Sequence, residues 1–461
     1  MTETYKSYLK KLDDTLRPGI SFDLIRRPFV LKGGREAMFY YIDGFVKDIS
    51  LGNIMTFLQN ADKIEDLPRN APYSEVETTR DSDRLVYMVL SGACVFIIDG
   101  LDDAMILDTR EYPVRSITEP ENDRVLRGPR DGFTETLVWN TALIRRHIRD
   151  PALVMHVISI GNFTQTDVVL CYIDGRADAG FVESMKKKLG DIEIGALNMG
   201  QQSIAELLIR NRWYNPFPKL RYTERPDTAS AMLLEGSVLV ICDNTPSVLI
   251  LPTSIFDFLQ ATDDYCFPPL VGTYLRLLRL SVFFITLILT PVWYLLLKNP
   301  EWIPSWLEYI KVTAISPVPI IIQLFLVEFA IDSLRLASMN TPNALSSSLN
   351  VVGGLILGDF AVKVGWLIPE VILYMALVAI TNFTQSSYEL GYALKFMRML
   401  LLLGVAVANV WGFAFMLIVM IVLIVTNKSV DGSRSYLYPL IPWNGRAMKR
   451  LFLRVKLKEN K

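Results

Sequence analysis

The pattern of hydrophobic positions changes near residue 275 of this chain. Before that point, short apolar runs such as AMFYYI and ACVFII alternate with turn residues, which predicts strands and helices packed around a core. After it, apolar runs long enough for membrane helices follow one another. The pattern therefore predicts an α/β soluble half followed by an α-helical transmembrane bundle.

The apolar runs of the second half bound the number of membrane passes. They cover residues 280–297, 312–337, 351–383 and 399–426. Four spans are preferred, with the polar residues 384–398, including Lys395 and Arg398, outside the bilayer. Six spans are the alternative, because the third run fits either one broken helix or a re-entrant piece followed by a span. The fourth run fits one tilted helix or two short ones around Gly412.

The charges at the ends of the bundle predict its orientation. Residues 428–461 carry nine Lys and Arg against Asp431 and Glu459, so this basic tail is expected on the cytoplasmic side. Arg276 and Arg279 precede the first run and put the front half on the same side. The first residues are polar and contain no apolar signal segment, so the front half is expected to stay where it is made.

Three charged residues within the second apolar run indicate its environment. Glu328, Asp332 and Arg335 are spaced by four and three, so on a helix they share one face. Ionisable groups in a membrane helix point at protein, water or each other. Either they form a self-satisfied salt bridge near a helix end, or they line a pore. In the pore hypothesis Arg335 neutralises Asp332, and Glu328 is the freer charge facing a water-filled path between subunits.

Three further charged residues, Asp359, Lys363 and Glu370, lie inside the third run. Asp359 and Lys363 are four residues apart, so they can pair on one helix face. We count them, with the three charges of the second run, as candidate pore-lining residues.

The soluble half repeats its own landmarks. YIDG occurs at residues 41–44 and again at 172–175, each time before a predicted helix. The stretch at 90–109 matches that at 234–253 with an offset of 144, and both predict a strand, a short turn and a second strand. Two landmarks in one order indicate duplicated α/β units. Two ordinary hairpins of similar sequence are the alternative.

A segment rich in both charges joins the two units, with a helix predicted over residues 134–148. Its candidate interface residues, at a contact between subunits or domains, are Arg127, Arg130, Arg145, Arg146 and Arg149. A solvated, salt-bridged linker is the alternative reading.

These patterns predict six regions in chain order. They are a polar lead-in (1–35), a first α/β subdomain (36–117), the arginine-rich connecting segment and helix (118–151), a second α/β subdomain (152–270), the transmembrane domain (271–427) and the basic cytoplasmic tail (428–461).

Composition narrows the classes of function. Residues 1–275 hold 30 Lys and Arg against 39 Asp and Glu, and such an acidic half argues against nucleic acid as a partner. The chain has two histidines and four widely separated cysteines, which disfavours a metal site. We find no paired carboxylates with acid–base spacing, nucleophile elbow or phosphate loop, so no enzymatic activity and no cofactor are expected.

Three long stretches resemble those of a known family: LRGPRDGFTETLVWNTALIRRHIRDP, RYTERPDTASAMLLEGSVLVICDNTPSVLILPT and YLYPLIPWNGRAM. They are similar to the spore germination receptor A-subunit family, the GerA family, and the resemblance runs from about residue 20 to 455. It implies a germination protein of the inner spore membrane whose copies assemble into an ion channel. It further implies a soluble half facing the spore core and a membrane-embedded partner subunit. Asp359 and Lys363 depart from the Gln and Glu of the family pattern, so pore selectivity does not transfer with them.

Three functions remain in competition on these grounds. The first is a subunit of an oligomeric germination complex that forms or gates a channel for monovalent cations. The second is the A subunit of a nutrient germinant receptor proper. The third is a secondary transporter of ions or small solutes with its substrate site in residues 351–383.

Overall fold

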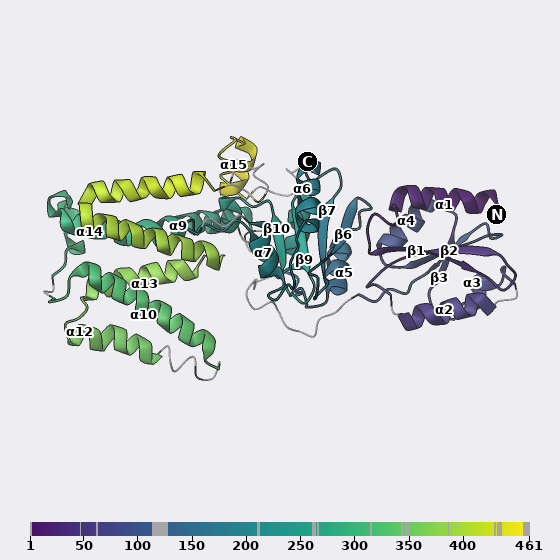
Figure 1. Ribbon diagram of the computed structural model, residues 1–461, viewed down its shortest axis with the longest axis horizontal. Helices are drawn as coiled ribbons and strands as arrows, with labels where there is room; N and C mark the ends of the chain where they lie inside the picture. Colours follow the sequence, from purple (N-terminus) through teal and green to yellow (C-terminus); the bar gives the residue numbers. More distant parts are fainter. Residues whose placement is uncertain are drawn as a thin grey trace. The chain divides into compact units, whose positions relative to one another are not determined.

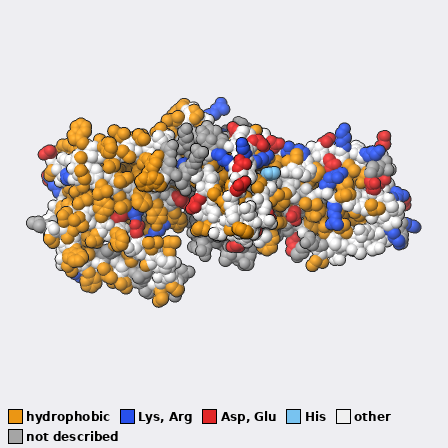
Figure 2. Space-filling model, in the orientation of Figure 1, with side chains coloured by type: hydrophobic (Ala, Val, Ile, Leu, Met, Phe, Trp, Pro, Cys, Tyr) orange, Lys and Arg blue, Asp and Glu red, His pale blue; other side chains and the backbone are white. Residues whose placement is uncertain are grey.

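The chain divides into two units in the computed structural model. The α/β unit comprises Met1–Asn211, Leu220–Thr253 and Val430–Ser433, and the helical unit comprises Arg212–Lys219, Ser254–Ser429 and Arg434–Lys461. The structure describes residues 2–46, 48–60, 63–112, 128–209, 213–260, 264, 267–313, 316–342, 345, 351–385, 387–427, 430 and 436–454. Figure 2 shows hydrophobic side chains over much of the visible face of the helical unit, whereas charged side chains are more frequent on the α/β unit.

Two five-stranded antiparallel sheets form the centre of the α/β unit (Figure 1). The first contains β1 (Leu24–Val30), β2 (Glu36–Ile42), β3 (Val76–Thr79), β4 (Cys94–Ile98) and β5 (Ala104–Leu107). The second contains β6 (Leu153–Ile160), β7 (Thr166–Ile173), β8 (Arg221–Thr223), β9 (Val238–Cys242) and β10 (Val248–Leu251). The strand orders are β1-β2-β4-β5-β3 and β6-β7-β9-β10-β8, so the second sheet repeats the order of the first.

Helices cover both faces of each sheet. The first sheet is covered by α1 (Glu3–Leu16) and α4 (Ser82–Leu90) on one face and by α2 (Asp48–Asn60) and α3 (Leu67–Asn70) on the other. The second is covered by α5 (Leu137–His147) with α8 (Pro226–Leu234), and by α6 (Ala179–Gly190) with α7 (Gln201–Leu208). This explains why β4 and β9 are apolar at every position, since alternate side chains enter different cores.

The repeat extends to single backbone positions. Both YIDG turns end a strand, and Gly44 and Gly175 have φ of 82° and 78°, which glycine adopts at low cost. The hairpins β4–β5 and β9–β10 keep the offset of 144 residue by residue. The two sheets therefore share the strand order that the predicted duplication of α/β units requires.

The first repeat begins earlier than residue 36. The lead-in contains α1 and β1, and α1 corresponds to α5 because each packs beside the equivalent helix, α4 or α8. Thr2 caps α1, and its buried side chains recur at helical spacing: Tyr5, Tyr8, Leu12 and Leu16. The apolar stripe is narrow within a polar sequence, which is why composition alone indicated a lead-in.

Two short edge strands form in charged, proline-bearing stretches whose sequence predicts loops. Residues 61–82 contain β3, and residues 215–227 contain β8. Each pairs with the outer strand of its hairpin, β5 or β10. Four and three residues give no readable alternation, so hydrogen bonding to the hairpin, rather than local sequence, determines them.

Three cysteines lie on central strands with their side chains buried. Burial raises the pKa of Cys94 to about 12 and that of Cys242 to about 11, while Cys171 is also shifted upward by burial. Thiols held protonated in this way act as small apolar side chains. Cys266 lies outside the described residues.

The helical unit consists mainly of apolar helices. These are α9 (Pro269–Lys298), α10 (Ile320–Asn340), a π-helical turn η5 (Ile356–Phe360) continuing into α12 (Ala361–Lys363), α13 (Pro369–Phe383), α14 (Tyr388–Val425) and α15 (Gly445–Phe452). Short 3₁₀ turns are η1 (Ile255–Leu259), η3 (Pro300–Trp302) and η4 (Ser305–Ile310). Among the described residues, α9 and α14 are long and apolar enough to cross a membrane.

Helix α14 is two antiparallel arms rather than one rod (Figure 1). Ala408 and Asn409 leave the helical conformation, and Asn409 has φ of 51°. The arms then touch through Gly404 and Gly412, where an added Cβ would lie 2.6 Å and 1.9 Å from the facing carbonyl oxygen. Small residues allow this close approach, as they do between membrane helices generally.

The prediction of a polar connection over residues 384–398 is wrong for most of that stretch. Residues 388–407 form the first arm of α14, and Lys395 and Arg398 are buried in it. A burial of this kind requires counter-charges from a neighbouring helix, which the local sequence does not reveal.

Candidate functional site

Four charged side chains meet inside the helical unit, two from α10 and two from the first arm of α14. Arg398 Nη2 lies 2.5 Å from Glu328 Oε2, and Lys395 Nζ lies 3.4 Å from Glu328 Oε1. Lys395 also forms an ion pair with Asp332. Glu328 and Asp332 are four residues apart on α10, and Lys395 and Arg398 are three residues apart on α14. Each pair therefore lies on one face of its helix, and the two faces meet at one interface. We call Glu328, Asp332, Lys395 and Arg398 the charge cluster.

The charge cluster is largely removed from solvent. Arg398 is 1% exposed, Lys395 4% and Glu328 8%. Arg398 also donates to the Thr286 carbonyl of α9 at 2.9 Å, so three helices meet at its guanidinium. Buried ions of this kind are tolerated only when paired, and removing one partner leaves an uncompensated charge.

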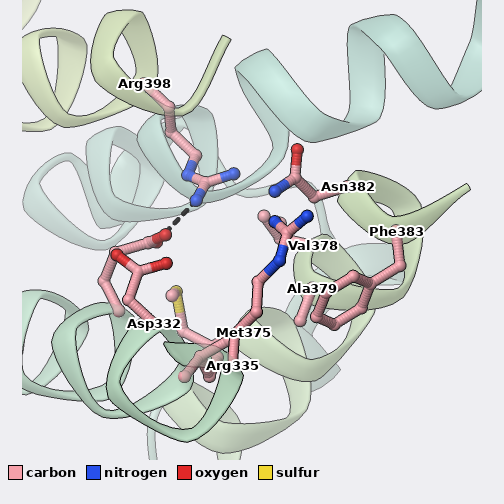
Figure 3. A pocket seen from close by; sticks show the side chains of 10 residues that line it. Asp332, Arg335, Met375, Val378, Ala379, Asn382, Phe383 and Arg398 are labelled. Atoms are coloured by element: carbon pink, nitrogen blue, oxygen red, sulfur yellow. Dashed lines mark hydrogen bonds and ion pairs between the residues drawn. The ribbon is translucent and has the colours of Figure 1, made fainter. Parts of the chain in front are cut away.

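A small cavity adjoins the charge cluster (Figure 3). Its volume is about 10 Å³ for the centre of a water molecule, which is room for one water at most. Asn382 of α13 and Arg335 of α10 lie across it from Arg398 (Figure 3). Little free space therefore remains beside Glu328, Lys395 and Arg398, while 34% of the Asp332 side chain is exposed.

Arg335 does not take the role expected from its spacing. Its guanidinium lies over three aromatic rings, those of Phe383, Tyr388 and Tyr392, at 5.4, 4.9 and 5.1 Å. The cation paired with Asp332 is Lys395. The expectation that Arg335 neutralises Asp332 is wrong, and so is the expectation that Glu328 is the freer charge. The ion pairs between α10 and α14 form in place of a pair between Arg335 and Asp332 along α10. Lys395 and Arg398 have no other carboxylates near them in the described chain.

Asp359 and Lys363 lie on a different segment, with exposed side chains. Within the described part of the chain they form no ion pair with each other, and Lys363 Nζ lies 5.9 Å from the Phe360 ring. Their assignment to a pore stays a prediction.

The connecting arginines lie in the α/β unit. Arg145 is buried, with its Nε 2.8 Å from Asp23 Oδ2, and it also donates to Ser21 Oγ at 3.3 Å. Arg149 donates to Tyr87 and Ser91 at 3.3 Å. These contacts join α5 and the residues directly after it to residues of the first repeat.

The other connecting arginines have different surroundings. Arg146 lies 4.6 Å above the Tyr112 ring, and Arg130 is exposed. Arg127 lies outside the described residues. A role for these arginines between copies of the chain stays a prediction.

The interactions within the charge cluster are ion pairs between two carboxylates and two cations. Within the described residues, no group of three His, Cys, Asp or Glu side chains could hold a metal ion. Sequence reasoning missed Lys395, Arg398 and Asp23. The readable signal for the first two was their spacing of three directly before an apolar run, which places both on one helix face.

The chain matches known proteins along most of its length. The family described as "Bacillus/Clostridium GerA spore germination protein" matches residues 10–461. Stage V sporulation protein AF of Bacillus subtilis (strain 168) is 37% identical over 445 residues, which cover 95% of this chain and 89% of that protein. Spore germination protein KA of the same organism is 31% identical over 417 residues, covering 90% and 75%. The N-terminal domain of the A subunit of the Bacillus megaterium spore germinant receptor GerK3 is 25% identical, with a TM-score of 0.38, over 52% of this chain and 92% of that domain.

Proposed function

The chain belongs to the GerA family of spore germination proteins, and from that premise we propose that its helical unit forms or gates an ion path in an oligomeric membrane complex. The complex acts during germination, in the inner spore membrane, with both chain ends on the spore-core side. Its permeant ions are monovalent cations, and a membrane-embedded partner subunit accompanies the oligomer.

The exposed charges of residues 351–363 carry this proposal. Asp359 and Lys363 are exposed in a segment that is otherwise apolar, with Val351, Ile356 and Phe360 also exposed. A charged side chain facing lipid is costly, so such residues face water, a cavity or another subunit. Copies of the chain arranged with this segment inward satisfy both conditions at once. The exposed apolar side chains pack against other copies, and the charges face a water-filled path.

Helix length supports the same arrangement. Helix α13 has 15 residues, about 22 Å at 1.5 Å per residue, against a bilayer core of about 30 Å. The described part of the preceding segment, 351–363, is shorter still. Helices too short for lipid are tolerated where they line a water-filled cavity or lie against protein. The proposal counts six passes: α9, α10, residues 351–363, α13 and the two arms of α14.

The charge cluster has a supporting role in this proposal. It fixes α10 against α14 through ion pairs, beside the helices that carry the path. Displacing α10 separates Glu328 from Arg398, which gives the bundle two discrete arrangements, as gating requires. The second candidate function is the A subunit of a nutrient receptor, which is consistent with membership of the GerA family of germination proteins.

Reconstitution tests the proposal. The purified full chain is placed in vesicles loaded with potassium, and the initial rate of potassium release is measured over a wide range of concentrations. A path through an oligomer gives release that rises in proportion to the gradient and exceeds that of vesicles carrying heat-denatured protein. Saturable exchange, requiring a solute on the opposite side, would instead identify a transporter, and no release above the control would reject conduction by this chain alone.

A further inference from the structure

One end of the helical unit carries an exposed aromatic and basic surface that the ion path does not use. Helix α15 and the turn before it, residues 436–454, lie beside the first turns of α9 (Figure 1). Leu440, Ile441 and Trp443 are exposed there, Trp443 by 69%. Arg446, Lys449 and Arg450 are exposed on one face of α15, since Lys449 and Arg450 follow Arg446 by three and four positions.

Specific contacts hold α15 at the beginning of α9. Arg276 of α9 donates to the carbonyl oxygens of Arg450 and Leu453, and Thr273 Oγ1 accepts from the Arg454 backbone N–H at 3.2 Å. Gly272 permits this approach, because a Cβ there would lie 2.9 Å from Arg454 Cδ. Buried Asp264 pairs with both Arg276 and Arg279, which fixes the arginines that hold α15. Helix α15 therefore lies level with the first turns of α9, which is apolar and long enough to cross a membrane.

A second segment, distant in sequence, carries aromatic side chains at the same end. Trp213 is 94% exposed and Tyr214 packs edge to face against it, with ring centroids 6.0 Å apart. Asn215 donates to the Leu423 carbonyl at 3.1 Å, where the second arm of α14 ends. The core that contains Phe217 also contains Tyr436, so the two segments share one end of the bundle.

We propose that residues 436–454, together with Trp213 and Tyr214, form an interfacial collar that binds the anionic phospholipid headgroups of the leaflet at this end. Tryptophan and tyrosine concentrate where membrane helices meet water, because each ring has an apolar body and a polar edge. Arg446, Lys449 and Arg450 make no ion pair within the described part of the chain, so their charges are available to lipid phosphates. Apolar and aromatic side chains next to a basic helix face are the composition of helices that lie in the plane of the bilayer surface.

The chemistry of the surface favours lipid over a protein partner. Charge complementarity identifies an anionic ligand, and the position beside the start of α9 identifies the leaflet boundary. Each cation near an anionic surface strengthens the attraction of the segment to that surface by about fivefold in affinity. The inference does not depend on conduction, since it concerns only the surface at the end of the bundle.

Lipid quenching of Trp443 fluorescence tests the inference. The full chain is placed in phosphatidylcholine vesicles with increasing phosphatidylglycerol, and the Trp443 signal is the difference between the native chain and Trp443→Phe. We expect bromine near the headgroup end of the acyl chains to quench this signal more than bromine near the terminal methyl group. Quenching should increase with the phosphatidylglycerol fraction and fall at high salt. Trp306→Phe supplies the control, because Trp306 is exposed in η4, which contains no basic residue.

A variant without the cations separates lipid binding from aromatic exposure. Arg446→Gln, Lys449→Gln and Arg450→Gln together should abolish the dependence on phosphatidylglycerol while Trp443 remains in place. The matched variant Lys6→Gln, Lys10→Gln and Arg27→Gln removes three exposed cations from the α/β unit. In this variant the quenching should still depend on phosphatidylglycerol. An unquenched Trp443 that emits like indole in water would overturn the inference. An unquenched, blue-shifted Trp443 would overturn it in favour of a protein partner.

Discussion

Replacing Arg398 by methionine is expected to lower the free energy of unfolding of the helical unit by about 3–5 kcal/mol. The change removes the closest partner of Glu328 while leaving its carboxylate buried, and methionine replaces only the aliphatic part of the arginine side chain, without its charge. Thermal unfolding of the full chain in detergent, followed by tryptophan fluorescence, measures the effect. Buried Trp293 of α9 reports on the same unit.

A matched arginine variant and a double variant make this test specific. Arg335→Met removes a cation held over aromatic rings, which should cost about 1–2 kcal/mol. Glu328→Met combined with Arg398→Met should cost less than the sum of the single changes by about 1–3 kcal/mol, because neither charge is then left buried alone. Equal losses for Arg398→Met and Arg335→Met, with additive behaviour of the double variant, would show that the charge cluster does not hold the helices together.

Asp359→Asn is expected to lower potassium release from reconstituted vesicles about tenfold, because a carboxylate lining a narrow path concentrates cations there. Lys363→Gln should raise the rate, since it removes a repelling charge from the same segment. Both changes are isosteric or nearly so at exposed positions, and neither touches the charge cluster. Stability should therefore remain at the native value, which distinguishes an electrostatic effect on flux from loss of folded protein.

Glu301→Gln is the control for Asp359→Asn. Glu301 is an exposed carboxylate of the same helical unit, located in η3 between α9 and α10, outside the proposed path. Release by this variant should equal that of the native chain. If Asp359→Asn leaves release unchanged at equal protein in the vesicles, residues 351–363 do not line the path.

The repeated half of the fold could be predicted from sequence because its signals are local. The YIDG turns and the offset hairpins contain their glycines and apolar runs within a few residues, and β4–β5 maps onto β9–β10 residue by residue. Strands β3 and β8 could not be predicted, since their conformation comes from pairing with a hairpin rather than from their own residues.

The charge cluster shows the same division between local and distant information. The spacing of Glu328 and Asp332 correctly indicated a shared helix face that requires protein surroundings. Their partners were missed because 70 residues separate Glu328 from Arg398, and the sequence carries no signal of which helices become neighbours. The Arg145–Asp23 pair was missed for the same reason, with 122 residues between them. Charge spacing therefore predicted the need for partners but not their identity.

The assembled protein in a lipid nanodisc, imaged by single-particle electron microscopy, tests the central claim most directly. The account predicts several copies around an axis, with residues 351–363 facing it and Asp359 bordering a continuous water-filled passage. Copies that assemble through other helices, or single copies with residues 351–363 against lipid, would contradict an ion path built from this segment.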